Sequence, residues 1–235
     1  MSKNENGPDS EVAEMQVMLN SLGYNCGTVD GIMGPATKAS ETRLQNERTV
    51  YLVLKEAGLK DAAIAGVMGN IQAESSFRTE LSGYGGAGGI CQWEGSRLER
   101  LKEYAYEMGL EETDIRLQAD FLALELTPYS SKYDRACMNL LELLRGMEDN
   151  EGNAQMAADY FNALFERNRN KPTWEEVISE CEKCGWAIHR FSKKPNAYNN
   201  RFYLDAPKRR GAAKAFYYKM KNLYEEREEE EKWQD

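Results

Sequence analysis

Apolar residues recur every three or four positions along most of the chain, the spacing of helices that pack one face against a core. The clearest case is residues 61–74. Four of its apolar residues lie at i, i+3, i+4 and i+7: Ile64, Val67, Met68 and Ile71. Glu74 continues this stripe at the end of the predicted helix, and Ser75 and Ser76 then begin a loop. Strand patterns are scarce, so the sequence predicts a mainly α-helical protein.

Further helices follow the same periodicity. We expect them at residues 96–108, 113–125, 133–145, 154–165, 174–184 and 211–224. Between the last helices, residues 168–206 contain two prolines and many Asn and Lys residues. This stretch is less regular, and we expect an insertion there.

A separate small unit is predicted at residues 11–46. A first helix ends near Gly23, residues 29–35 form a turn, and a second helix begins at about Ala36. We expect the Asp30 side chain to bond backbone N–H groups of the turn and Gly31 to adopt a positive φ. Residues 1–10 are expected to be a flexible N-terminus, and residues 225–235 an acidic tail.

Composition narrows the class of protein. The chain has 235 residues, a net charge of −9, and neither a long apolar run nor a secretory signal pattern, so we expect no membrane insertion. From Lys183 to Lys221, eleven Lys and Arg residues stand against the single acid Asp205. This basic stretch suits anionic wall polymers or acidic parts of the same fold. No recognition motif accompanies it, so we expect no nucleic-acid partner.

The five cysteines are odd in number and irregularly spaced, which does not indicate a disulfide framework. Cys181 and Cys184, followed by the single histidine His189, suggest zinc, but no second ligand pair completes a four-ligand site. We therefore expect no metal and no cofactor. A serine or cysteine nucleophile activated by histidine would depend on His189 alone.

A glycine-rich segment at residues 83–89 lies close after the Glu74 helix. It satisfies a dinucleotide-binding pattern, but no strand leads into it and no helix opens at its last glycine, so we reject that function. Glycines let the backbone approach a ligand, and the following Ile90, Gln92 and Trp93 offer an apolar anchor, an amide and an aromatic face. This set suits a sugar.

These motifs carry a family resemblance. The Glu-Ser pair after an apolar helix, followed by Gly-Ile-Cys-Gln-Trp at residues 89–93, resembles the phage tail lysozyme family, relatives of goose-type lysozymes and soluble lytic transglycosylases. Residues 159–167 are similar to the family's aromatic Glu-Arg segment, and the resemblance spans residues 47–224. Residues 11–46 resemble the peptidoglycan-binding domain of wall hydrolases, without its usual second Asp-Gly segment. That unit either binds wall or serves only as a buttress.

The resemblance implies a lysozyme-like helical catalytic domain with a small loop or hairpin region, joined to a small helical N-terminal domain. It implies cleavage of the β-1,4 bond between N-acetylmuramic acid and N-acetylglucosamine, with Glu74 as general acid. Partial burial would favour the protonated carboxyl that this role requires. The second carboxylate is open between Glu94 and Glu80. If neither serves, the muramoyl group assists and the enzyme is a lytic transglycosylase.

The substrate-binding residues expected beside Glu74 are Ser75, Gly89, Gln92, Trp93 and Tyr198. For Trp93, packing between helix and loop is the alternative to stacking on a sugar. The expected partners are bacterial peptidoglycan and other phage tail proteins, and the expected location is the virion tail or the extracellular cell wall. Two other functions are weighed: a catalytically silent wall-binding tail module, and peptide-bond cleavage, for which zinc ligands or a Cys/His pair are not convincingly present.

Overall fold

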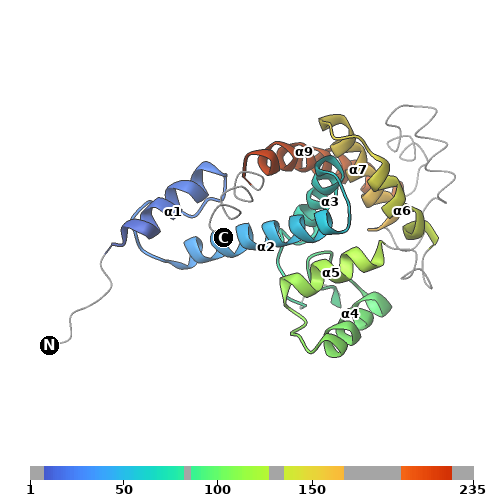
Figure 1. Ribbon diagram of the computed structural model, residues 1–235, viewed down its shortest axis with the longest axis horizontal. Helices are drawn as coiled ribbons and strands as arrows, with labels where there is room; N and C mark the ends of the chain where they lie inside the picture. Colours follow the sequence, from blue (N-terminus) through green and yellow to red (C-terminus); the bar gives the residue numbers. More distant parts are fainter. Residues whose placement is uncertain (1–7, 82–85, 127–134, 167–196, 224–235) are drawn as a thin grey trace. The chain divides into compact units, whose positions relative to one another are not determined.

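The structure is a computed structural model that describes residues 8–81, 86–126, 135–166 and 197–223. The expected mainly helical class is confirmed (Figure 1). Within these described residues no strand forms. The only pairing of strand type in this part of the chain is an isolated antiparallel bridge between Gly88 and Trp93 in the glycine-rich loop.

The chain divides into two compact units, residues 1–48 and residues 49–235. The first contains helix α1 (Ser10–Ser21) and the start of helix α2 (Pro35–Glu56). Asp9 caps α1 by accepting a hydrogen bond from the Glu11 amide at 2.8 Å.

The turn between α1 and α2 has the predicted construction. The Asp30 carboxylate accepts the Ile32 amide at 2.9 Å, and Gly31 has a φ of 70°. The buried Gln16 was not anticipated: its side-chain oxygen accepts the amides of Asp30 and Gly31, both at 2.9 Å. Its side-chain nitrogen donates to three further groups of the turn and of α2: the Asp30 carboxylate, the Ile32 carbonyl and the Thr37 hydroxyl. One amide side chain therefore holds most of this turn.

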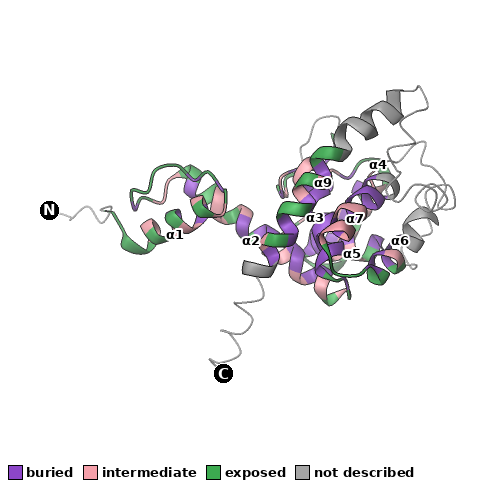
Figure 2. Ribbon diagram, turned by 90° about the horizontal axis from the view of Figure 1, so that it is seen from above, coloured by how far each residue is buried: buried purple, intermediate pink, exposed green. Residues whose placement is uncertain are grey.

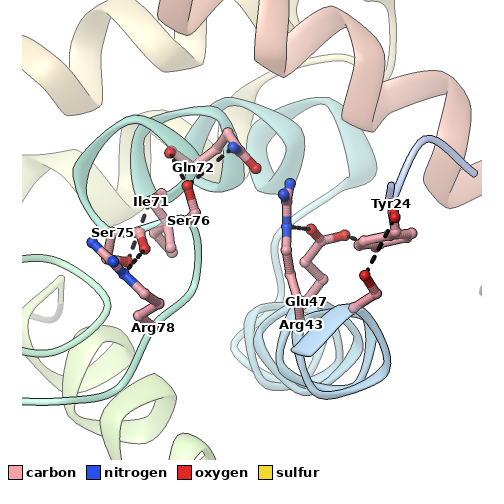
Figure 3. A network of polar contacts seen from close by, with 9 residues as sticks. Tyr24, Arg43, Glu47, Ile71, Gln72, Ser75, Ser76 and Arg78 are labelled. Atoms are coloured by element: carbon pink, nitrogen blue, oxygen red, sulfur yellow. Dashed lines mark hydrogen bonds and ion pairs between the residues drawn. The ribbon is translucent and has the colours of Figure 1, made fainter. Parts of the chain in front are cut away.

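Helix α2 is longer than predicted: it was expected to end near residue 46, but it continues to Glu56. No Gly or Pro interrupts residues 36–56, and the first breaker is Gly58, with a φ of 85°. Within the first unit the buried Glu47 on α2 accepts hydrogen bonds from Tyr24 and, at 3.0 Å, from Arg43 (Figure 3).

Helix α3 (Asp61–Glu74) lies at the centre of the second unit, packed against both α7 (Glu151–Leu164) and α9 (Ala197–Leu223) (Figure 1). The predicted apolar stripe is buried, and so is every other residue from Asp61 to Ile71 (Figure 2). The helix is therefore surrounded on all sides, whereas the sequence pattern indicated one buried face. Two glycines make this possible. A Cβ on Gly66 would lie 2.4 Å from the Ala157 Cβ, and one on Gly69 would lie 2.7 Å from the Arg209 carbonyl oxygen.

The remaining described helices are α4 (Gly95–Met108), α5 (Ile115–Glu125) and α6 (Arg135–Gly146), close to the predicted ranges. Helix α4 packs on α5, and α6 packs on α7.

The predicted start of the last helix was wrong. It was expected at residue 211, after an irregular stretch, but α9 begins at Ala197 and contains Pro207. A proline removes one helical hydrogen bond, and directly after it Arg209 and Ala213 pack against Gly69 of α3, which holds the helix on the C-terminal side of the proline. The predicted helix at 174–184, with Cys181, Cys184 and His189, lies outside the described residues.

No helix in the described part of the chain is long and apolar enough to cross a bilayer. Among the same residues, no group of three or more His, Cys, Asp or Glu side chains could hold a metal ion. Cys26 and Cys91 are buried free thiols.

Candidate functional site

Glu74 occupies the last position of α3, with 23% of its side chain exposed. Its Oε1 accepts a hydrogen bond from Arg209 Nη2 at 2.5 Å, which forms an ion pair between α3 and α9. The side chain thus lies at the edge of the core, open enough for a ligand to approach.

Arg209 is fixed in turn by α3. Its Nη1 donates to Asn70 Oδ1 at 2.9 Å, and the fully buried Asn70 donates through Nδ2 to the carbonyls of Gly66 at 2.9 Å and Ala158 at 3.0 Å. The close approach of α9 at Gly69 brings the arginine within reach. Sequence reasoning missed Arg209, although it did expect the basic stretch to meet anionic wall polymers or acidic parts of the same fold. The available signal was the pair of glycines in α3, which is typical of close helix packing.

The chain turns sharply after Glu74. Ser75 is buried, and its hydroxyl donates to the Ile90 carbonyl at 2.8 Å, which ties the end of α3 to the glycine-rich loop. Figure 3 shows this end of α3, where Arg78 Nε donates to the Ser75 carbonyl at 3.0 Å and the Gln72 amide donates to the Ser76 hydroxyl at 3.3 Å. Ser75 therefore joins the two parts of the site.

Backbone strain is concentrated at this corner. Three non-glycine residues have positive φ among those described: Ser76 at 55°, Phe77 at 63° and Gln92 at 49°. All three lie beside Glu74 or in the loop joined to it. Such conformations cost roughly 1–3 kcal/mol each and persist where the surroundings hold them, often at functional sites. Here the buried Phe77 ring packs edge-on against Phe216 of α9, with ring centroids 5.6 Å apart.

The loop from Gly88 to Trp93 is closed by two backbone hydrogen bonds between these residues, of 2.8 and 3.0 Å. Gly89 is buried with a φ of 72°, and a Cβ there would lie 2.8 Å from the Trp93 ring. The buried Gln118 of α5 accepts the Ile90 amide at 2.9 Å, a support that sequence reasoning did not foresee. Gly89 is thus required by the loop's own packing, and its side-chain position is filled by protein.

Gln92 is partly exposed, and its amide nitrogen donates to the Gly89 carbonyl at 2.9 Å. Its side-chain oxygen and second N–H are not used by this bond. A partly exposed amide that uses only one of its groups to hold the loop suits a residue that contacts ligand.

Trp93 is 1% exposed. Its ring packs against Phe121 with centroids 5.5 Å apart, and its Nε1 donates to Glu125 Oε2 at 2.7 Å. This geometry fits the packing alternative, because no face of the ring is available to stack on a sugar.

Cys91 is buried between these elements. Burial raises the pKa of its thiol well above the usual value, and the negative charge of Glu166 adds to this effect. A thiol that keeps its proton is a poor nucleophile. The site therefore does not favour cysteine-based peptide cleavage.

The other sequence-predicted residues are less closely joined to Glu74. Glu94 is exposed at the N-cap position of α4, one residue after the Gly88–Trp93 bridge. Glu80 is also exposed, and its carbonyl accepts the Gly89 amide of the loop at 2.8 Å. Tyr198 belongs to the first turn of α9, but its side chain lies outside the described residues.

Comparison with known proteins identifies a family. The family profile described as phage tail lysozyme matches residues 45–220, well over half of the chain. Searches of curated proteins and of solved structures returned no match. The matched range includes Glu74, the glycine-rich loop and Arg209. The chain therefore belongs to the phage tail lysozyme family, whose members are lysozyme-like enzymes that degrade peptidoglycan.

Proposed function

We propose that this protein is a muramidase that cleaves the β-1,4 bond between N-acetylmuramic acid and N-acetylglucosamine, with Glu74 as general acid. The observation that carries the proposal is the setting of Glu74. It is a mostly buried carboxyl at a helix end, joined through Ser75 to a strained, glycine-rich loop. Family membership supplies the substrate class.

In this mechanism Glu74 donates its proton to the glycosidic oxygen as the bond breaks. A positioned acid of this kind contributes about 10² to 10⁴ in rate. Ser75 holds the loop at a fixed distance from the acid, and the free amide groups of Gln92 bind N-acetyl or hydroxyl groups of the sugar. The buried Trp93 contributes indirectly, because its packing maintains the conformation of the loop.

Hydrolysis ordinarily needs a second carboxylate to activate water or to act as nucleophile. We propose Glu94 for this role, because it is exposed directly after the loop that carries Gln92. A lytic transglycosylase would not need it, since the muramoyl hydroxyl attacks within the same sugar and yields a 1,6-anhydro end.

The test uses purified peptidoglycan and three variants. Glu74→Gln is expected to abolish solubilisation while the circular dichroism spectrum stays unchanged, and Glu94→Gln is expected to slow it strongly. Glu99→Gln, an exposed acid on α4, serves as the control and should retain full activity. Turnover by Glu74→Gln near that of the wild type would refute the mechanism.

Mass analysis of the released fragments then identifies the reaction. Reducing muramic ends mean hydrolysis, and 1,6-anhydro ends mean transglycosylation. Binding of the wild type to walls without release of fragments would instead favour a silent wall-binding module.

For the location we propose the phage virion tail, with peptidoglycan as the substrate and other tail proteins as partners. The family supports a tail or extracellular setting. We further propose that the first unit, residues 1–48, binds the wall through the surface around its Gln16-supported turn.

A further inference from the structure

We propose that Arg209 is the positioning residue of the catalytic acid: it fixes the Glu74 carboxyl group and stabilises the negative charge left when the proton departs. This inference rests on the proposed role of Glu74. Arg209 lies on a helix far along the chain from Glu74, because the two residues are 135 positions apart.

The geometry supports positioning first. Arg209 bonds Glu74 through Nη2 and Asn70 through Nη1, so a single planar group is held at two points on the same helix. Asn70 is itself fixed by the Gly66 and Ala158 carbonyls. An anchored guanidinium limits the rotamers of the carboxyl that it bonds. Glu74 therefore presents its carboxyl group in one orientation.

The energetics also favour a functional pair over a stabilising one. Arg209 is 5% exposed, and its Nε is buried without a hydrogen-bond partner in the described structure. Burying a guanidinium costs desolvation that one carboxylate often does not repay, so a buried ion pair is weak evidence for stability. Here the pair occurs at the one partly exposed acid on the last turn of α3.

The proposed proton transfer changes the charge of Glu74. As Glu74 transfers its proton to the glycosidic oxygen, the C–O bond breaks and the carboxyl becomes a carboxylate. The ion pair between Arg209 and Glu74 represents the carboxylate that remains after the transfer. With the protonated acid the same interaction is weaker, so it grows as the proton leaves and acts on kcat more than on KM.

The adjacent residue provides a matched control. Arg210 forms its own partly buried pair with Asp159 of α7, donating from Nε to both carboxylate oxygens at 2.8 Å. Arg209→Met and Arg210→Met therefore each remove one partly buried ion pair of α9, and only Arg209→Met removes the ion pair with Glu74.

The experiment measures kcat and KM on soluble glycan strands, together with Tm, for the full chain. We expect Arg209→Met to lower kcat by about 100-fold with KM within twofold. Arg209→Lys, which keeps the charge but cannot bond Asn70 and Glu74 together as a fork, should lie between the wild type and Met. Arg210→Met should lower Tm about as much as Arg209→Met does, while its kcat stays within twofold of the wild type.

The inference is overturned if folded Arg209→Met keeps kcat within twofold of the wild type, or if Arg210→Met loses as much kcat as Arg209→Met. If Arg209→Met does not fold, Arg209→Lys decides, because unchanged kcat in that variant would show that the fork is not needed. Failure of the underlying function is recognised separately: an active Glu74→Gln variant refutes the acid role, whereas an inactive Glu74→Gln with an active Arg209→Met refutes only the positioning role.

Discussion

The indole N–H of Trp93 donates to the Glu125 carboxylate at 2.7 Å, which joins the last residue of the bridged loop to the end of α5. The same carboxylate accepts two hydrogen bonds from Arg97 of α4, at 2.6 and 2.9 Å. Arg97 also lies over the Phe165 ring, 4.1 Å from its centroid. One buried acid therefore holds the loop, α4 and α5 together.

Glu125→Ala should destabilise the second unit by about 3–5 kcal/mol, because it removes the carboxylate that compensates a largely buried guanidinium. Urea unfolding followed by circular dichroism measures the change. Glu99→Ala, which removes the exposed partner of Lys102 on α4, is the control and should leave stability almost unchanged. Equal midpoints for the two variants would show that Glu125 has no such role.

Gly69→Ala should be disruptive, because its Cβ would lie 2.7 Å from the Arg209 carbonyl oxygen and 2.8 Å from the Ala213 nitrogen. Those are backbone atoms, so α9 must move, and overpacking of this kind costs roughly 1–3 kcal/mol or more. Gly211→Ala on α9 is the matched control, since nothing lies within 4 Å of its Cβ. It should stabilise the helix by about 0.5–1 kcal/mol. If Gly69→Ala and Gly211→Ala shift the thermal midpoint in the same direction, the close packing at Gly69 does not have the predicted effect.

Burial raises the pKa of Asp159 to about 6, although Arg210 opposes the shift. The folded protein thus keeps this proton to higher pH than the unfolded chain, in which the Asp carboxyl has its ordinary pKa of 3.8. More protons are bound in the folded state within that window, so the free energy of unfolding falls as pH rises from about 4 to 6. The slope is up to about 1.4 kcal/mol per pH unit.

Urea titrations at a series of pH values test this effect, with Asp159→Asn as the reference that cannot titrate. The stability of the wild type relative to the variant should decrease from pH 4 to 6 and then level off. A difference that is constant or rises over this range would contradict the assignment.

Gln16→Ala should unfold the turn of the first unit, because the partly buried amide of Asp30 and the buried amide of Gly31 lose their acceptor. Each unsatisfied buried group costs about 1–3 kcal/mol. Hydrogen exchange at residues 24–37 reports the loss, with the exposed Gln45→Ala on α2 as the control. Slow exchange retained in Gln16→Ala would show that the turn does not depend on this side chain.

The sequence predicted the position of Glu74 because helical periodicity is local: Ile64, Val67 and Met68 establish the register that places the acid at the helix end. The role of Asp30 in its turn was predictable for the same reason. Arg209 was not, because its contact with Glu74 depends on how α9 packs against Gly69. The burial of Trp93 likewise depends on Glu125, 32 positions later in the chain.

For helix α9, local sequence signals predicted the wrong start. Pro207 and Gly211 resemble a boundary, and the local signal favoured a start at residue 211. Tertiary packing outweighs that signal, since Arg209 and Ala213, which directly follow the proline, are buried against α3. Pro207 does weaken a helix locally, but contacts between α9 and α3, which sequence periodicity does not reveal, keep the helix continuous there.

The positive φ angles of Ser76, Phe77 and Gln92 bear on any effort to make this enzyme more heat-resistant. Glycine at these positions would relieve the local steric cost, and a screen selecting only for thermal tolerance would be drawn to them. The same replacements would loosen the corner that orients Glu74 and the loop. Thermostable versions should therefore be sought elsewhere, because in this corner robustness and catalytic power are expected to trade against each other.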